Sequence, residues 1–168
     1  LKDIIDSEAF SVVRLSKIYR QAESSHIVLN AHKINAGELI TLDNKNKDFF
    51  FFEKKDVRSV MGALVYLVKT RLPEYIGASP FEIQVLTPMR KGELGVEHLN
   101  EVLQYYLNPA SESKKEKEGR TGVFREGDKV MQVKNNYKLE WKITNAKGFS
   151  IEEGLGVFNG DMGIIKQI

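Results

Sequence analysis

Short apolar segments alternate with amphipathic helical patterns through the first two thirds of the chain, and this alternation limits the fold more than any other feature. The strand-like apolar segments occupy 11–15, 49–52 and 81–86. The patterns with helical spacing occupy about 22–36, 57–72 and 95–107. Strands that alternate with helices are typical of a parallel sheet with helices packed on it, so we expect an α/β fold in this part.

Single residues indicate where these helices begin and end. Asp56 can cap the N-terminus of the helix that follows it, and Pro73 is expected to stop that helix. Gly37 suits the position after the end of the preceding helix, and Pro109 closes the last one.

The character of the sequence changes after residue 109. Residues 110–122 are polar, highly charged and free of large apolar side chains, which is typical of a linker. Beyond them, β patterns alternate with turn residues, and Asn159-Gly160 is a strong hairpin-turn dipeptide. We therefore predict an α/β domain over 1–109, a charged linker over 110–122 and the start of a small β-barrel over 123–168. Both ends of the sequence suggest a piece of a longer protein.

Composition excludes several classes of protein. The net charge of +2 is too small to indicate nucleic-acid binding without local sites. The absence of cysteine excludes disulfides and thiolate metal sites and fits a reducing compartment, so we expect a cytoplasmic protein. No apolar run suffices to span a membrane. His26 and His32 would lie on opposite sides of a helix, so no metal site is predicted.

The first candidate site is the segment 15–22, where a predicted strand passes into a helix. Open α/β sheets bind ligands at such strand ends. Tyr19 offers an aromatic face and Arg20 a planar positive group, which is well suited to stabilising charge on a transferring γ-phosphoryl group. The alternative is an ordinary surface arginine at the start of a helix.

The second candidate is the basic loop that follows the predicted strand 81–86. A hydroxyl group, backbone N–H groups and two cationic side chains at the start of a helix make a plausible phosphate site. The candidate residues of this phosphate site are Thr87, Pro88, Met89, Arg90 and Lys91. The alternative is a solvent-facing loop without a ligand.

The third candidate lies in the predicted barrel, where amides, aromatic side chains and turns are mixed. Small barrels of this kind often bind single strands by stacking and backbone contacts. Asn136, Tyr137 and Asn159 are the predicted contacts. The alternative is that these residues only form hairpin turns.

Three blocks of the sequence together resemble RecD/TraA-type helicases of superfamily 1, the family of the exodeoxyribonuclease V alpha subunit. Ile18-Tyr19-Arg20-Gln21-Ala22, with the helix after it, resembles motif IV. Val85-Leu86-Thr87-Pro88-Met89-Arg90-Lys91-Gly92, with Leu99-Asn100, is similar to the next block. Residues 124–132, 135–137 and 156–161 resemble the opening of the SH3-like insert.

The resemblance implies a partial second RecA-like motor domain followed by the start of an SH3-like barrel. Arg20 matches the arginine that reaches the γ-phosphate of ATP across the cleft between motor domains, with Tyr19 and Gln21 beside the nucleotide. Thr87 and Arg90 match positions at the DNA backbone, and Asn100 is added as a DNA contact. ATP and Mg²⁺ would serve the complete protein, which would move 5′→3′ along single-stranded DNA.

The resemblance also implies what other parts would have to supply. The chain contains no glycine-rich phosphate loop with its lysine, so we predict that it does not hydrolyse ATP alone. Its partners would be single-stranded DNA, a first motor domain and, in some family members, nuclease-complex subunits. Two alternatives remain: a related motor that does not separate strands, and a non-enzymatic module that binds single-stranded nucleic acid through the barrel.

Overall fold

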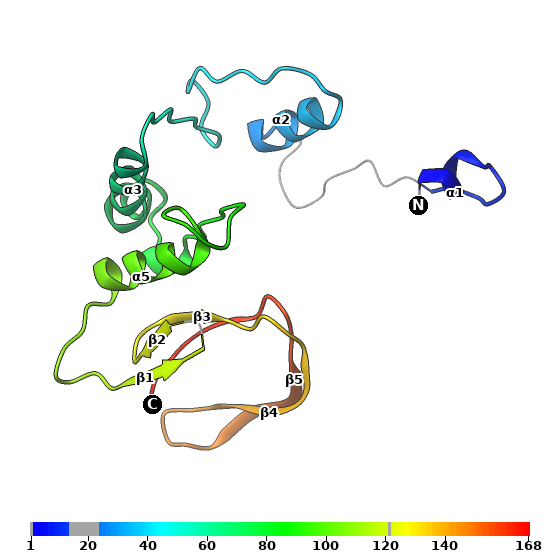
Figure 1. The fold of residues 1–168 in the computed structure, drawn as a ribbon. Coiled ribbons are helices and arrows are strands. Elements are labelled where there is room, and N and C mark those ends of the chain that lie inside the picture. The colour runs from blue at the N-terminus through cyan, green and yellow to red at the C-terminus, as the bar shows by residue number, and fades with distance from the viewer. Residues whose placement is uncertain (1, 14–23, 121) are drawn as a thin grey trace. The chain divides into compact units, whose positions relative to one another are not determined.

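The computed structural model describes residues 2–13, 24–120 and 122–168, and these form two compact units, 1–53 and 54–168 (Figure 1). The first unit contains helices α1 (Lys2–Asp6) and α2 (His26–Asn35). The second contains every other element. No helix in the described ranges is long and apolar enough to cross a bilayer.

Helix α2 begins where side chains satisfy its free N–H groups. The Ser25 hydroxyl accepts a hydrogen bond from the Ile27 N–H (3.2 Å), and the Asp48 carboxylate accepts from the His26 N–H (3.1 Å). The hydrogen bond from Ser25 and those from His26 lower the pKa of Asp48. After α2 the backbone turns at Gly37, whose φ of 74° suits glycine, as expected from its place after the helix.

A long helical run opens the second unit. It comprises α3 (Val57–Tyr66), the π-helical turn η1 (Leu67–Arg71) and α4 (Leu72–Ile76). Asp56 caps its start, as predicted, by accepting from the Ser59 N–H at 2.9 Å.

Pro73 does not stop this run, contrary to our prediction. The backbone changes register before the proline, because the Leu72 N–H donates to the Leu67 carbonyl in a π-helical turn. Pro73 then lies in the first turn of α4, where its missing N–H costs little. The run ends instead at Gly77, in the left-handed conformation with φ of 68°.

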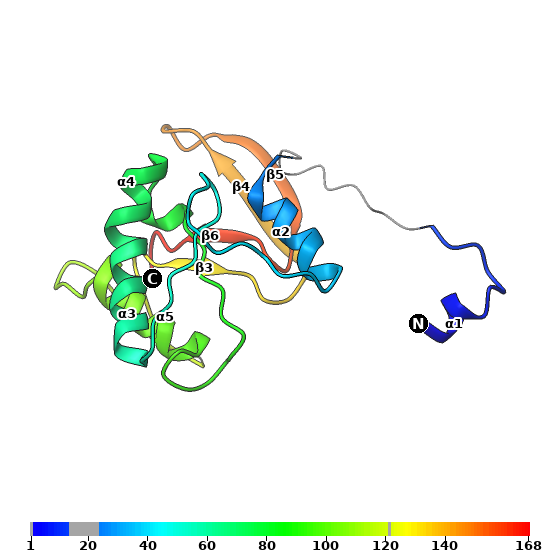
Figure 2. The ribbon, with the colours of Figure 1, turned by 90° about the horizontal axis from the view of Figure 1, so that it is seen from above.

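A short 3₁₀ turn, η2 (Pro80–Glu82), and helix α5 (Val96–Leu107) complete the helical part, and α3 and α5 are neighbours in both ribbon views (Figures 1 and 2). Leu99 on α5 and Val68 in η1 are the buried apolar residues of these helices.

All strands of the described residues lie after residue 115, in three antiparallel pairs. The pairs are β1 (Glu116–Gly119) with β2 (Gly122–Arg125), β3 (Lys129–Met131) with β6 (Met162–Ile164), and β4 (Asn136–Thr144) with β5 (Ser150–Val157). This arrangement is compatible with the expected SH3-like barrel. Strand β1 falls inside the charged segment that we expected to be a linker.

The parallel sheet expected over 1–109 is not present among the described residues. Residues 49–54 are assigned neither helix nor strand, and 80–82 form the turn η2 through a capping box between Ser79 and Glu82. Near 51, a side chain takes the place of a neighbouring strand: Asn44 accepts from the Phe51 N–H (2.6 Å) and donates to its carbonyl (2.8 Å). The predicted strand 11–15 lies partly outside the described residues.

The Asn159-Gly160 dipeptide forms a turn, but not the hairpin that we predicted. The Asp161 N–H donates to the Phe158 carbonyl at 3.0 Å, and Gly160 has a φ of 98°. The strands on either side do not pair with each other, because β5 pairs with β4 and β6 with β3. The Gly160 N–H donates instead to the Gln132 carbonyl (2.8 Å), so the turn is fastened to the end of β3.

Candidate nucleic-acid interface

The motif IV candidates Tyr19, Arg20 and Gln21 lie outside the described residues. Their proposed roles therefore rest on the sequence alone.

The basic loop is folded back onto the first turn of α5. The Thr87 hydroxyl donates to the Leu94 carbonyl at 2.8 Å, and the Val96 N–H donates to the Met89 carbonyl at 3.0 Å. Gly95 makes this close approach possible, since a Cβ there would lie 2.5 Å from the backbone of Lys91. The loop is thus held by its backbone and by the Thr87 hydroxyl, and the side chains after Thr87 are exposed.

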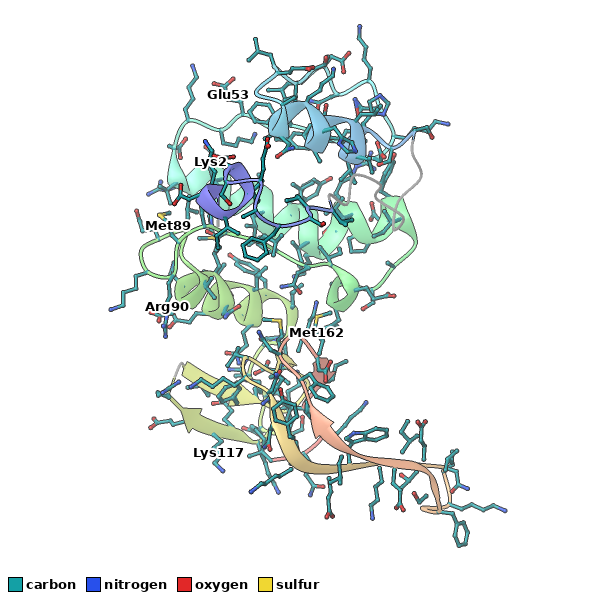
Figure 3. The ribbon with its side chains drawn as sticks, turned by 90° about the vertical axis from the view of Figure 1, so that its right-hand side faces the viewer. Lys2, Glu53, Met89, Arg90, Lys117 and Met162 are labelled. Atoms are coloured by element: carbon teal, nitrogen blue, oxygen red, sulfur yellow. The ribbon has the colours of Figure 1, made fainter. Side chains whose placement is uncertain are left out.

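Met89 and Arg90 project from this loop (Figure 3). The Arg90 guanidinium lies 3.1 Å from the Glu97 carboxylate, yet its side chain remains 75% exposed. Pro88 and Lys91 are also exposed. An exposed ion pair of this kind contributes little stability and can be exchanged for a phosphate contact.

Thr87 and Asn100 are placed differently from these exposed loop residues. Thr87 is half-buried, and its hydroxyl proton is used within the loop. It therefore positions the loop and has no proton to give a phosphate oxygen while that bond lasts. Asn100 is exposed on α5, one turn beyond the loop.

The barrel brings its predicted residues together. The Asn135 side chain links both segments, since its Nδ2 donates to the Tyr137 hydroxyl (2.8 Å) and its Oδ1 accepts from the Asn159 N–H (2.8 Å). The rings of Tyr137 and Phe158 meet edge to face, with centroids 5.8 Å apart. We name Asn135, Asn136, Tyr137, Phe158 and Asn159 the Tyr137 cluster.

The aromatic rings of the Tyr137 cluster remain open to solvent. Tyr137 is 67% exposed and Phe158 45% exposed, and Gly156 gives the Phe158 ring room, because a Cβ there would lie 3.0 Å from it. The Tyr137 ring is held by the hydrogen bond from Asn135 and the Phe158 ring contacts it, and exposed rings placed in this way are suited to stacking on bases. Asn135 and Phe158 belong to the candidate segments 134–137 and 158–161 but not to the predicted contacts.

Trp141 adds a further aromatic surface on the long hairpin β4–β5. It pairs across the hairpin with Gly154, and a Cβ at Gly154 would lie 2.5 Å from the indole ring. Trp141 is 37% exposed. Trp141 is not among the predicted contacts, and the sequence signal for it is the alternation of apolar and charged residues along 137–143.

A buried polar cluster joins the end of α5 to the barrel. Asp128 is 9% exposed and its carboxylate accepts from Gln104 Nε2 (2.6 Å), Asn108 Nδ2 (2.7 Å) and the Arg125 N–H (2.7 Å). Arg125, 8% exposed, donates to the Glu116 carboxylate and to the Asn108 carbonyl. A buried carboxylate satisfied by several donors fixes the geometry around it.

A second carboxylate ties the end of the described chain to β1. Glu126 accepts from the Ile168 N–H (3.1 Å) and from the Lys115 N–H (3.2 Å), and these two backbone hydrogen bonds lower its pKa. Acidic and histidine side chains of the described ranges form no group that could hold a metal ion.

Comparison with known families finds a match in the second part of the chain. Residues 99–168 match the family described as the SH3 domain of ATP-dependent RecD-like DNA helicases. This range begins in α5 and includes all the strands of the barrel.

The particular similarity is to an ATP-dependent RecD2 DNA helicase of Deinococcus radiodurans. The two are 30% identical over 159 residues, which cover 95% of this chain and 18% of the relative. Both comparisons support the RecD-like helicase family, as the resemblance implied. The chain spans less than a fifth of that relative's length.

Proposed function

We propose that this chain is part of an ATP-dependent 5′→3′ DNA helicase, in which it supplies an arginine to the ATP site and a part of the single-stranded DNA track. The observation that carries the proposal is the match of the barrel to a RecD-like SH3 domain, together with similarity to a RecD2 helicase along 95% of the chain. Residues 1–109 are then a part of the second motor domain.

The proposed track has two surfaces. The Tyr137 cluster offers two exposed rings on which bases can stack. Its side-chain amides can form hydrogen bonds with the polar edges of the bases. The loop 87–91 offers Arg90 and Lys91 to phosphates. Arg90 and Lys91 contact phosphates in this proposal, so DNA binding by the 168-residue chain is expected to be weak at most and to be sensitive to salt.

In the complete protein, Arg20 is proposed to act at the γ-phosphate of ATP bound by a first motor domain, with Tyr19 and Gln21 near the nucleotide and Mg²⁺ on the phosphates. An arginine placed there stabilises charge that develops during transfer more than it stabilises bound ATP. The 168-residue chain alone is expected to show no ATP turnover above blank.

Fluorescence anisotropy with a labelled single strand tests the track. Tyr137→Ala should weaken binding of the single strand about tenfold, which corresponds to the loss of one stacked base. Tyr105→Ala is the matched control, since Tyr105 is equally exposed on α5 (69%). If the wild type and Tyr137→Ala bind the single strand with equal affinity, the Tyr137 cluster is not part of the DNA-binding surface.

A second candidate function is a non-enzymatic module that binds single-stranded nucleic acid. It is favoured by one observation, the exposed Tyr137 cluster lying wholly within the SH3-like part. This alternative predicts that the barrel accounts for all binding and that Arg20 is without effect on ATP turnover of the complete protein. The helicase proposal predicts a large loss.

A further inference from the structure

Two surfaces proposed to contact DNA lie on parts of the fold that are joined by helix α5. The loop 87–91 is bonded to the first turn of the helix, where Glu97 binds Arg90 through its carboxylate and donates its N–H to the Arg90 carbonyl (3.2 Å). The last turn and the C-cap carry Gln104 and Asn108, which bind the barrel through Asp128. The helix has 12 residues and is therefore about 18 Å long.

Strand β3 and the hydrogen bonds at its end connect Asp128 to the Tyr137 cluster. Strand β3 begins at the next residue and ends just before Gln132, whose N–H donates to the Asp161 carbonyl (2.8 Å) and whose carbonyl accepts from Gly160. The turn held in this way includes Asn159, which binds Asn135. The orientation of the cluster therefore depends on how β3 is fixed to α5.

A second attachment joins the start of β3 to the segment before the loop 87–91. The Lys129 ammonium group donates to the Ile83 carbonyl (3.1 Å) and to Gln84 Oε1 (3.2 Å), in the segment that leads into the loop 87–91. The contacts of Asp128 and Lys129 both lie at the start of β3, but they reach different segments, α5 and residues 83–84, so together they limit the orientation of β3 more than one contact would.

We infer that α5 and the buried Asp128 hold the loop 87–91 and the Tyr137 cluster at a fixed spacing, so that one single strand of DNA contacts both surfaces at once. The inference rests on the proposed function, because it presupposes that both surfaces bind DNA. Asp128 is in this view a positioning residue that touches no nucleotide. Two linked surfaces bind more tightly than either alone because the second contact is intramolecular, and the gain depends on their geometry.

The dependence of DNA affinity on the length of the DNA strand shows whether Asp128 positions the two surfaces or only stabilises the fold. A strand of about four nucleotides matches one surface, whereas one of about sixteen can reach both. Asp128→Asn replaces an acceptor with an amide that faces the donors of Gln104 and Asn108. It should weaken binding of the long strand about tenfold and change binding of the short strand less than twofold.

The experiment is an NMR and anisotropy titration of the 168-residue chain with oligodeoxythymidylate of the two lengths. Asp6→Asn provides the control, because it makes the same change of charge at an exposed position on α1. If Asp128→Asn loses its β-sheet signal in circular dichroism, Gln104→Met is used, which removes two hydrogen bonds without a change of charge. Gln167→Met, at an exposed glutamine, is the control for that variant.

A loss confined to the long strand supports the inference. Equal affinities of Asp128→Asn and Asp6→Asn for the long strand overturn it, as does a wild-type chain that gains no affinity with length. In both of these outcomes Tyr137→Ala would still weaken binding. If Tyr137→Ala and the wild type bind every strand equally, the proposed function itself fails, and the inference fails with it.

Discussion

The segment around residue 51 and the strand pair β3–β6 have similar apolar character, but their backbones are satisfied differently. In the first, one side chain, Asn44, binds both the N–H and the carbonyl of Phe51, and the rings of Phe51 and Phe52 stay exposed (44% and 59%). In the second, backbone pairs with backbone over Lys129–Met131, and Asp128 extends the contact to α5. An apolar run becomes a strand only where another backbone edge is available to it.

The units that contain these two regions, residues 1–53 and residues 54–168, are also proposed to contribute differently to function. The largest expected effect, at Arg20 in the first unit, tests this difference. Arg20→Ala in the complete protein should lower DNA-stimulated ATP hydrolysis by about a thousandfold, because the arginine acts mainly on the transition state. Binding of ATP should change little. Steady-state turnover and nucleotide titration measure the two quantities. Unchanged turnover would assign all function to the barrel.

The buried polar cluster should contribute much more stability than an exposed amide on the same helix. Asn108→Ala removes a donor to the Asp128 carboxylate and should lower the free energy of unfolding by about 2 kcal/mol. Asn100→Ala, at an exposed position of α5, should change it by less than about 0.5 kcal/mol. Urea unfolding measures both. Similar values for the two variants would show that the cluster does not hold the barrel to the helix.

The Asn44–Phe51 contact should contribute less, because it is a single exposed site. Asn44→Gly keeps a residue that tolerates the φ of 56° but removes both hydrogen bonds, so that about 1 kcal/mol of local stability is lost. Amide hydrogen exchange at Phe51 should accelerate accordingly. Unchanged exchange at this amide would mean that the side chain does not substitute for a neighbouring strand.

The smallest expected effect concerns pH. The pKa of Glu126 is lowered by the backbone N–H groups of Ile168 and Lys115, so its contribution is fully present above the ordinary carboxyl pKa and is lost as pH falls through the lowered value. Glu126→Gln should flatten the acid side of the stability profile. Thermal unfolding measured across acidic pH for both proteins gives the comparison, and parallel profiles would exclude Glu126 as a source of the pH dependence.

The sequence predicted what depends on neighbours along the chain and missed what depends on distant partners. The helix start at Asp56 and the turn at Asn159-Gly160 follow from local chemistry, and both are present. The pairing of β3 with β6 joins segments about thirty residues apart in sequence, and no local signal specifies it.

In the candidate site too, features set by neighbouring residues were predicted and those set by distant residues were not. The spacing of Asn136 and Tyr137 from Asn159 revealed two turn-like segments, whereas the Asn135 side chain that joins them could be assigned only from the fold. The buried role of Asp128 was equally hidden, because an aspartate before an apolar strand reads as a surface residue in sequence.

The central claim is that the Tyr137 cluster is the contact of the barrel with single-stranded DNA. The most direct measurement is an NMR titration of the 168-residue chain with a short oligodeoxythymidylate, observing ring and amide resonances. The account predicts that the signals of Tyr137, Phe158 and Asn159 shift together with one dissociation constant and that those of Tyr105 stay in place. Chemical shift changes confined to residues outside the Tyr137 cluster, or equal changes with duplex DNA, would contradict this claim.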